Sequence, residues 1–412
     1  MGNYIESIQQ HQLNKRRTIA IQGRNLIIVG NNGAGKTQFL SALNNHLVQV
    51  FNQHIGMTLE QLKQNRSVYQ NQLKNLTEGS DEYQSQIGNI EYYDGLIKER
   101  EQFDVIFSRS SDIYNEVKRK NVFMRFFEAH RRYESNPANL LTSVDNLFEE
   151  FKLNSSQGIN FPTSSFFERY LVSMSNYALI EKGAGAIEEF ERVVKVIEKI
   201  QGDLRELFED YSLKLVFNRK KLRMEIEQEG KEPFSLSTLP SGFASILAIY
   251  AELIMLSELS NKDRGDIKGI VLIDEIDAHL HVTVQKKVFD FFSKSFPGVQ
   301  FIISTHSPFV VQSVSDAIIY NLSNDEHMED LSAYSYTSIV KGLLGESANS
   351  TELEGVLGEM DELSKKNDFN FRFDEINAYL DKKFDVLDAR AKSIVMSARA
   401  RKIDWEEAQG NV

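Results

Sequence analysis

The stretch "IIVGNNGAGKTQFL", residues 27–40, decides the fold. Its apolar run breaks into glycines and meets the spacing Gly-x-x-x-x-Gly-Lys-[Ser/Thr] at Gly30, Gly35, Lys36 and Thr37. Glycines let the backbone curl so that successive N–H groups point at a phosphate, and a following helix aims its N-terminus at the same charge. A glycine-rich turn with a chance lysine is the alternative, but the order strand, loop, helix favours a phosphate loop.

Each part of this stretch has an expected task. Lys36 reaches the β- and γ-phosphates, and the Thr37 hydroxyl ligates Mg²⁺. Apolar residues then recur at helical spacing at Phe39, Leu40, Leu43 and Leu47, which predicts a helix directly after the loop. The expected phosphate-binding residues are Gly30, Asn31, Asn32, Gly33, Ala34, Gly35, Lys36, Thr37 and Gln38.

The composition limits the class of protein. The 412 residues contain 41% hydrophobic and 26% charged residues, which is typical of a globular protein large enough for more than one lobe. Cysteine is absent, and we find neither a run of about 18 apolar residues nor a signal peptide, so we expect a cytoplasmic protein without a membrane partner. The net charge of -12 argues against a chain that coats nucleic acid, although one local basic groove remains compatible with it.

A second apolar strand ends in two carboxylates. In "GIVLIDEIDAHLH", residues 269–281, Asp274 and Glu275 lie on opposite faces of the strand, so they are expected to do different work. Asp274 would hold Mg²⁺, directly or through water, and Glu275 would polarise the attacking water. A strand that simply ends in a charged turn is the alternative, which the phosphate loop makes less attractive.

Two further stretches extend the expected site. The buried strand in "GVQFIISTHSPF" is followed at once by Ser304, Thr305 and His306, and a His at the carboxyl end of a core strand can contact a γ-phosphate. Ser241 and Gly242 precede a strongly apolar helix. Ser241 there is a good helix N-cap, but a hydroxyl, a glycine backbone and a helix N-terminus also form an anion site.

These elements together resemble the ATP-binding-cassette (ABC) ATPases of the SMC, RecF and OLD type. Residues 30–37 match the family's Walker A motif, residues 272–275 its Walker B motif and residues 239–242 its signature motif, with residues 278–281 at the D-loop and His306 at the switch histidine. The resemblance implies an α/β head with a P-loop core sheet that binds ATP and Mg²⁺. It also implies that Ser241 of one subunit completes the ATP site of another, so that ATP joins two copies.

The signature departs from the family pattern. Pro240 and Phe243 are unusual residues at their positions in this motif, so the contacts of the signature are expected to differ in strength from those of the family. The implied catalytic residues are Glu275 and His306, and the implied metal ligands are Thr37 and Asp274.

An insertion separates the two halves of the head. Leu59, Leu62, Arg66, Tyr69, Leu73 and Leu76 alternate by three and four, and a second stripe returns after "TEGS". We expect an antiparallel helical hairpin with arms of about 20 residues, or about 30 Å. It would serve as a protruding oligomerisation or partner surface, with an ordinary core hairpin as the alternative. The expected domains are residues 1–56 and 103–325 for the head, 57–102 for the hairpin and 326–412 for a mostly helical C-terminal region.

Two other segments have weaker signals. "NVFMRFFEAHRRYES" reads as a strand ending in Glu128, His130, Arg131 and Arg132. The resemblance implies that this strand end carries the loop that senses Mg²⁺ and partners. Its basic cluster could touch phosphate or DNA or form a solvated loop. The C-terminal region, residues 326–412, lacks the paired acids of the Toprim nuclease that OLD proteins carry, so we expect no nuclease site in this chain.

The function implied by this resemblance is regulatory. The chain resembles the stand-alone ATPases of bacterial anti-phage systems such as Septu and PARIS, which act with a separate nuclease or toxin and form oligomers. We therefore expect an ATPase, with slow turnover compatible with the unusual signature, that assembles with itself around ATP and controls a separate effector. DNA or a phage component is a further candidate partner. The alternative is a DNA-repair ATPase of the RecF or SMC type that clamps DNA when bound to ATP.

Overall fold

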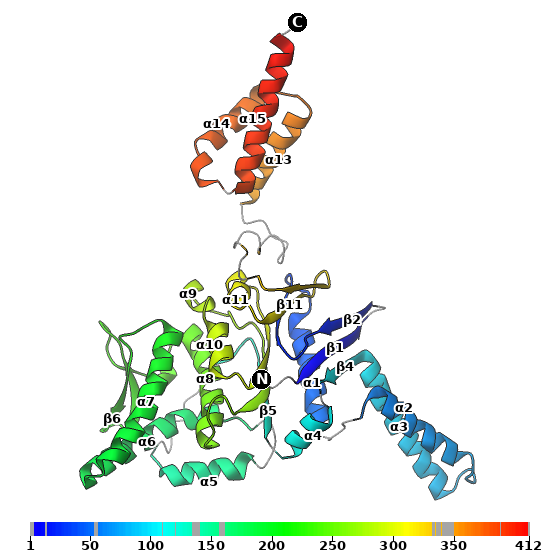
Figure 1. The fold of residues 1–412 in the computed structure, drawn as a ribbon, viewed down its shortest axis with the longest axis vertical. Coiled ribbons are helices and arrows are strands. Elements are labelled where there is room, and N and C mark those ends of the chain that lie inside the picture. The colour runs from blue at the N-terminus through cyan, green and yellow to red at the C-terminus, as the bar shows by residue number, and fades with distance from the viewer. Residues whose placement is uncertain are drawn as a thin grey trace. The chain divides into compact units, whose positions relative to one another are not determined.

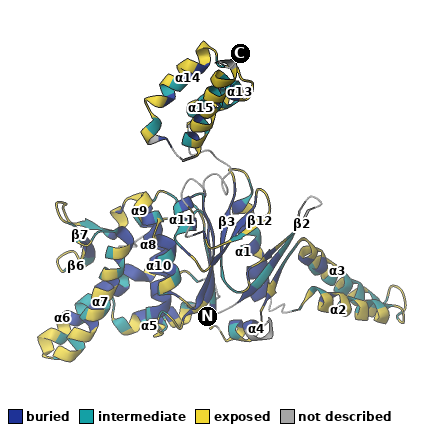
Figure 2. Ribbon diagram, turned by 45° about the horizontal axis from the view of Figure 1, so that its top comes forward, coloured by how far each residue is buried: buried dark blue, intermediate teal, exposed yellow. Residues whose placement is uncertain are grey.

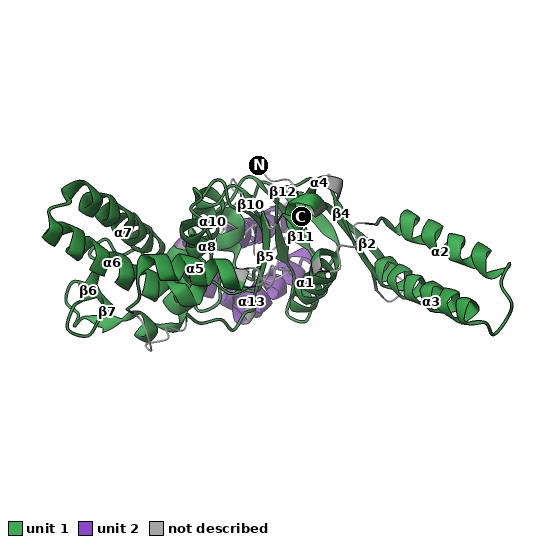
Figure 3. Ribbon diagram, turned by 90° about the horizontal axis from the view of Figure 1, so that it is seen from below, with its two compact units in different colours: residues 1–336 green, residues 337–412 purple. Residues whose placement is uncertain are grey.

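The computed structural model describes residues 4–12, 15–52, 57–108, 110–119, 121–133, 141–155, 161–331, 334, 339, 350–387 and 389–410. The chain divides into two compact units, Met1–Tyr336 and Thr337–Val412 (Figure 3). The first unit contains the phosphate loop, and the second is made of helices.

A six-stranded sheet forms the centre of the first unit (Figure 1). Its order is β12-β11-β3-β10-β9-β5, and all neighbours are parallel except β12, which runs antiparallel to β11 at the edge. Apolar side chains fill both faces of the inner strands, as expected for a parallel sheet covered by helices. The strands are β3 (Asn25–Val29), β5 (Val122–Phe127), β9 (Lys268–Ile273), β10 (Val299–Ser304), β11 (Ala317–Asn321) and β12 (Glu326–Glu329).

Two smaller antiparallel sheets flank this centre. One has the order β2-β1-β4, with β1 (Ile5–Gln12), β2 (Lys15–Ala20) and β4 (Phe103–Phe107). The other has the order β6-β7-β8, with β6 (Lys214–Asn218), β7 (Arg223–Glu227) and β8 (Phe234–Ser235). The predicted α/β class, with a P-loop core sheet, a helical insertion and C-terminal helices, is confirmed.

Helices cover the central sheet. The predicted helix after the phosphate loop is α1, and its stripe Phe39, Leu40, Leu43 and Leu47 is buried against β3 and β10. α1 spans Lys36–Asn52. Outside the hairpin, the other described helices of this unit are α4 (Ser110–Lys118), α5 (Val144–Ser155), α6 (Phe167–Ala184), α7 (Ile187–Phe208), α8 (Ser241–Leu259), α9 (Val282–Gln285), α10 (Val288–Ser295) and α11 (Pro308–Gln312). Two short 3₁₀ helices, Ser164–Phe166 and Leu236–Thr238, precede α6 and α8.

The helix α8 lies in the core of the unit (Figure 2). By length and composition it could cross a membrane, but 83% of its apolar window is buried inside the fold. A buried ion pair between Arg125 on β5 and Glu252 on α8 fixes it to the central sheet. Glu252 also accepts hydrogen bonds from the backbone N–H groups of Thr163 and Ser164, at 2.8 and 2.7 Å, so its carboxylate is well partnered. This helix therefore carries the signature segment on a firmly held support.

The insertion forms two antiparallel helices, α2 (Leu59–Leu73) and α3 (Asp81–Gln102), which project from the body beside β4 (Figures 1 and 3). A capping box at Thr58 starts α2, and Ser80 caps α3. Along the expected seam, Leu62 is fully buried and Tyr69 stacks on Tyr93 with ring centroids 5.5 Å apart. Most other side chains of the hairpin are exposed, so its outer surface is available for contacts.

The second unit has its own hydrophobic core. Its helices are α13 (Thr351–Lys365), α14 (Phe371–Asp381) and α15 (Ala389–Gly410), with a 3₁₀ turn at Phe384–Val386. Met360, Phe373, Leu380 and Val395 are buried in this core. The single tryptophan, Trp405, packs on Phe369 with ring centroids 5.4 Å apart.

The boundary between head and tail differs from the expected one. β12, at Glu326–Glu329, pairs with β11 and extends the central sheet beyond residue 325, where we expected the head to end. The strand "EHME" lacks an apolar run because it is an edge strand with little burial, so hydrophobicity could not mark it.

Candidate functional site

The phosphate loop has the backbone that its glycines predict. Gly30, Gly33 and Gly35 have positive φ angles of 147°, 81° and 88°. A β-carbon on Gly30 would lie 3.0 Å from the Ser323 hydroxyl, which accepts a hydrogen bond at 2.9 Å from the Asn31 backbone N–H. Ser323, on the turn after β11, therefore braces the start of the loop, and no motif in the sequence marked it.

The lysine of the loop is folded back onto the loop itself. Lys36 is 6% exposed, and its Nζ donates to the carbonyl oxygens of Gly30 and Asn31 at 2.7 and 3.2 Å. Burial lowers its pKa, whereas the carboxylates of Glu275, Asp274 and Asp277 act in the opposite direction. The positive charge thus lies at the carboxyl ends of the central strands, within the field of the acids that follow β9.

The end of β9 is held by β10. The Ser304 hydroxyl donates to Asp274, which is 1% exposed, and accepts a hydrogen bond from the Glu275 backbone N–H at 2.8 Å. One residue on, the Thr305 hydroxyl donates to Asp277 at 2.5 Å. The parallel register therefore places the predicted Walker B acids beside the predicted switch segment.

A residue of the basic cluster holds the same strand end from the other side. Arg131 donates to the backbone carbonyl oxygens of Asp274 at 2.7 Å, Glu275 at 3.2 Å and Ile276 at 3.4 Å. Burial lowers the pKa of Arg131 to about 10, against the opposing effect of nearby carboxylates. The sequence had suggested phosphate or DNA contact for this cluster, and for Arg131 the observed partners are main-chain atoms of its own chain.

The signature segment contacts the D-loop of the same chain. A β-carbon on Gly242 would lie 2.4 Å from the carbonyl oxygen of His279, so only glycine fits at this close approach. His279 itself has a positive φ of 62°. Phe243, one of the unusual residues, packs against Phe208 at the end of α7, with the rings tilted and their centroids 4.6 Å apart.

The interpretation of Ser241 as a helix N-cap is wrong. The N-cap of α8 is Pro240, which makes no side-chain cap hydrogen bond, and Ser241 is the first residue of the helix. The side chain of Ser241 is exposed and has no hydrogen-bond partner among the described residues. Pro240 has a φ of -52° and its carbonyl accepts a hydrogen bond at 2.9 Å from the Ala244 N–H, so it begins the helix without a side-chain cap.

The remaining expected residues surround the same edge. Thr37 and Gln38 are exposed in the first turn of α1, and Asn31, Asn32 and Gly33 are exposed in the loop, with Ala34 and Gly35 partly covered. His306 is half-buried directly after β10, next to Ser307, which caps α11. Exposed donors and a positive charge at the N-terminus of a helix suit a phosphate, and the Thr37 hydroxyl and Asp274 carboxylate are oxygen ligands of the kind Mg²⁺ prefers.

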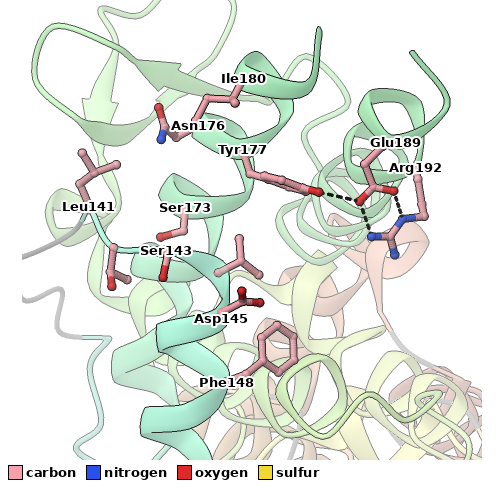
Figure 4. A pocket seen from close by; sticks show the side chains of 12 residues that line it. Leu141, Ser143, Asp145, Phe148, Ser173, Asn176, Tyr177, Ile180, Glu189 and Arg192 are labelled. Carbon is pink, nitrogen blue, oxygen red and sulfur yellow. Dashed lines mark hydrogen bonds and ion pairs between the residues drawn. The ribbon is translucent and has the colours of Figure 1, made fainter. Parts of the chain in front are cut away.

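A cavity of about 780 Å³ lies elsewhere, in the helical lobe between the start of α5 and the helices α6 and α7 (Figure 4). Tyr177 donates to Glu189 at 3.2 Å, and Arg192 pairs with the same carboxylate. The Ser173 hydroxyl is buried without a partner among the described residues. None of the expected nucleotide-binding residues lines this cavity, so it is separate from the candidate site.

Comparison with known proteins gives a family match. The profile of the family described as "AAA domain, putative AbiEii toxin, Type IV TA system" matches residues 26–312. The chain is 29% identical over 182 residues to the "Retron Vc95 probable ATPase" of Vibrio cholerae serotype O1 biovar El Tor, covering 42% of this chain and 35% of that protein. It is 31% identical over 162 residues to the "Septu protein PtuA" of Bacillus mycoides (strain KBAB4), covering 39% of this chain and 20% of that protein. The matched segments thus span about a third or less of these relatives.

Among solved structures, the chain is similar to an Smc head bound to the C-winged helix domain of ScpA. The match has 14% identity and a TM-score of 0.35, and it covers 77% of this chain and 94% of the other. The SMC head domain of Thermotoga maritima gives 13% identity and a TM-score of 0.30, with 77% and 94% coverage.

Proposed function

Because this chain belongs to the AAA-domain family whose profile matches residues 26–312, we propose that it binds ATP with Mg²⁺ at the phosphate loop and hydrolyses it slowly. The observation that carries this proposal is the meeting of three segments at one sheet edge: the loop with Lys36, the strand end with Asp274 and Glu275, and Ser304 at the end of β10. Bound ATP supplies the phosphoanhydride bond that is cleaved, and Mg²⁺ neutralises charge on its phosphate oxygens.

Each residue has a proposed task. The phosphates are held by the loop N–H groups of residues 30–38 and by the ammonium of Lys36. To reach them, Lys36 gives up its hydrogen bonds to the Gly30 and Asn31 carbonyls and donates to phosphate oxygens instead. Thr37 and Asp274 hold the metal ion. Glu275 takes a proton from the attacking water, and His306 contacts the γ-phosphate.

We further propose that two copies close around the nucleotide. Ser241 and Gly242 present an exposed hydroxyl and a helix N-terminus that no group of the same chain satisfies among the described residues. These groups suit the γ-phosphate held by a second copy, which would make the assembly depend on ATP. Higher oligomers would use further surfaces, such as the α2–α3 hairpin.

The biological role we propose is control of an anti-phage response in the cytoplasm. The retron and Septu names of the relatives support this role, and the chain would act as the regulatory ATPase for a separate nuclease or toxin. DNA or a phage component would then be the trigger.

One experiment tests the activity and the assembly together. Purified wild-type protein, Lys36→Ala and Glu275→Gln are compared for ATP turnover and for mass by light scattering with and without ATP. We expect turnover in the wild type only, and a stable ATP-dependent increase in mass for Glu275→Gln, because binding persists while hydrolysis slows by about 10²- to 10⁴-fold. Equal mass of Glu275→Gln with and without ATP would count against assembly around the nucleotide.

A second experiment tests the defence role. Cells that carry the gene with its native neighbours are challenged with a phage panel, and the wild type is compared with Lys36→Ala. Protection that disappears in the variant supports ATP-dependent defence. Lack of protection in both, together with ATP-dependent survival of DNA damage, would instead favour a clamp for DNA repair.

A further inference from the structure

We propose that Arg131 is a positioning residue for ATP hydrolysis, which holds the backbone of Glu275 so that the carboxylate of Glu275 faces the attacking water. This inference rests on the proposed ATPase function and adds to it a residue outside the named motifs of the site. Arg131 would touch neither ATP nor water, and it would act only through residues 274–276.

The contacts of Arg131 are concentrated on one short segment. Its guanidinium donates to three successive carbonyl oxygens, those of Asp274, Glu275 and Ile276, and also to the Glu128 carbonyl at 3.0 Å. A planar guanidinium with donors in a fixed fork suits such an array, whereas an ammonium could not satisfy it from one position. Arg131 therefore fixes the direction of the carbonyl groups where β9 ends.

Glu275 needs support of this kind because of its backbone conformation. Its φ is +45°, in the left-handed region that residues other than glycine rarely adopt. The Ser304 hydroxyl accepts from the Glu275 N–H at 2.8 Å on one side, and Arg131 donates to the Glu275 carbonyl on the other. The peptide groups before and after the Glu275 α-carbon are thus both held, which sets the direction of its side chain.

The surroundings of Arg131 keep its guanidinium charged and hydrogen-bonded. The carboxylates of Asp274, Asp277 and Glu275 oppose the effect of burial, and a pKa of about 10 leaves the guanidinium protonated at neutral pH. Asp277 accepts a hydrogen bond from Thr305, so the segment that Arg131 contacts is also held by the residue that follows β10. The neighbouring Arg132 differs, since it is exposed and its one hydrogen bond to a described residue is to the Ser237 carbonyl at 3.4 Å. Arg132 is therefore a matched control from the same loop.

The test separates positioning from binding. Arg131→Ala, Arg131→Lys and Arg132→Ala are compared with the wild type for kcat, for KM and for ATP affinity by calorimetry. We expect Arg131→Ala to lower kcat by about 10- to 100-fold, the range typical of residues that orient a catalytic group, with ATP affinity changed less than about twofold. Arg131→Lys should recover part of the loss, and Arg132→Ala should behave like the wild type. Loss of ATP affinity as large as the loss of kcat, or wild-type kcat in both Arg131 variants, would overturn the proposal.

A double variant provides the sharper readout. If Arg131 acts through Glu275, adding Arg131→Ala to Glu275→Gln should cause little further loss of the single-turnover rate, because effects through one residue do not multiply. Multiplying losses would show that Arg131 acts independently, and would contradict the inference. Melting temperatures of all variants identify any that unfold, and Arg131→Lys then carries the comparison. Absence of turnover in the wild type would refute the proposed function itself, which is a separate result.

Discussion

The end of β9 and the signature segment differ in how their polar groups are satisfied. At the end of β9, the carboxylates of Asp274 and Asp277 accept hydrogen bonds from Ser304 and Thr305, and the main chain of Glu275 is held by Ser304 and Arg131. At the start of α8, the Ser241 hydroxyl is exposed and unpartnered among the described residues. A partnered buried site is pre-organised for chemistry, whereas an exposed unpartnered donor suits a group that arrives from outside. Under the proposed function, the end of β9 would belong to the half of the site that hydrolyses ATP, and the start of α8 would belong to the half that a second copy completes.

The substitution of Lys36 has the largest expected effect, and it tests the half of the site proposed to bind and hydrolyse ATP. Lys36→Ala removes the one buried cation of the phosphate loop, and we expect ATP affinity to fall by about 100-fold or more, because a charge-assisted hydrogen bond to phosphate is lost. Calorimetry with ATP and Mg²⁺ measures this affinity. The control is Lys294→Ala, which removes an exposed lysine paired with Asp290. Unchanged affinity in Lys36→Ala would mean that the loop is not the nucleotide site.

Gly242 tests the link between the two halves. Gly242→Ala would place a β-carbon 2.4 Å from the His279 carbonyl oxygen, so the D-loop or the start of α8 must move. We expect a loss of about 1–3 kcal/mol in the free energy of unfolding, as for overpacked sites, and slower ATP turnover. Chemical denaturation and a turnover assay measure the two effects. Gly202→Ala, where the added carbon meets open space on α7, is the control, and equal behaviour of the two variants would show that this contact does not matter.

The sequence predicted the elements whose signal is local. The phosphate loop, the strand ending in Asp274 and the stripe of α1 each lie within about twenty consecutive residues, so periodicity and motif spacing could find them. Arg131 could not be assigned in this way, since its partner carbonyl on Asp274 lies 143 residues further along the chain. Every residue has a main-chain carbonyl, so the sequence does not mark those that Arg131 contacts. The basic residues around Arg131 instead suggested contact with phosphate or DNA.

The same reasoning explains the signature segment. The apolar run predicted a helix from Phe243 onward, and α8 begins two residues earlier, at Ser241. An N-cap at Ser241 was the alternative to an anion site and came from side-chain preference, but Pro240 occupies the cap and Ser241 is the first residue of the helix. The close approach of Gly242 to His279 arises from tertiary packing, and a glycine in the sequence does not indicate which residue will lie against it.

Ser241 offers the smallest and most selective test, because its removal should affect only the half that awaits a partner. Ser241→Ala deletes an exposed hydroxyl without a partner in its own chain, so the free energy of unfolding should stay within about 0.5 kcal/mol of the wild type. ATP-dependent assembly should weaken by about tenfold, the worth of one hydrogen bond across an interface. Light scattering at several protein concentrations in the Glu275→Gln background measures this, with Ser260→Ala at the other end of α8 as the control. If Ser241→Ala assembles like its parent, the unpartnered hydroxyl is not the group that a second copy uses, and the asymmetry between the two halves has another cause.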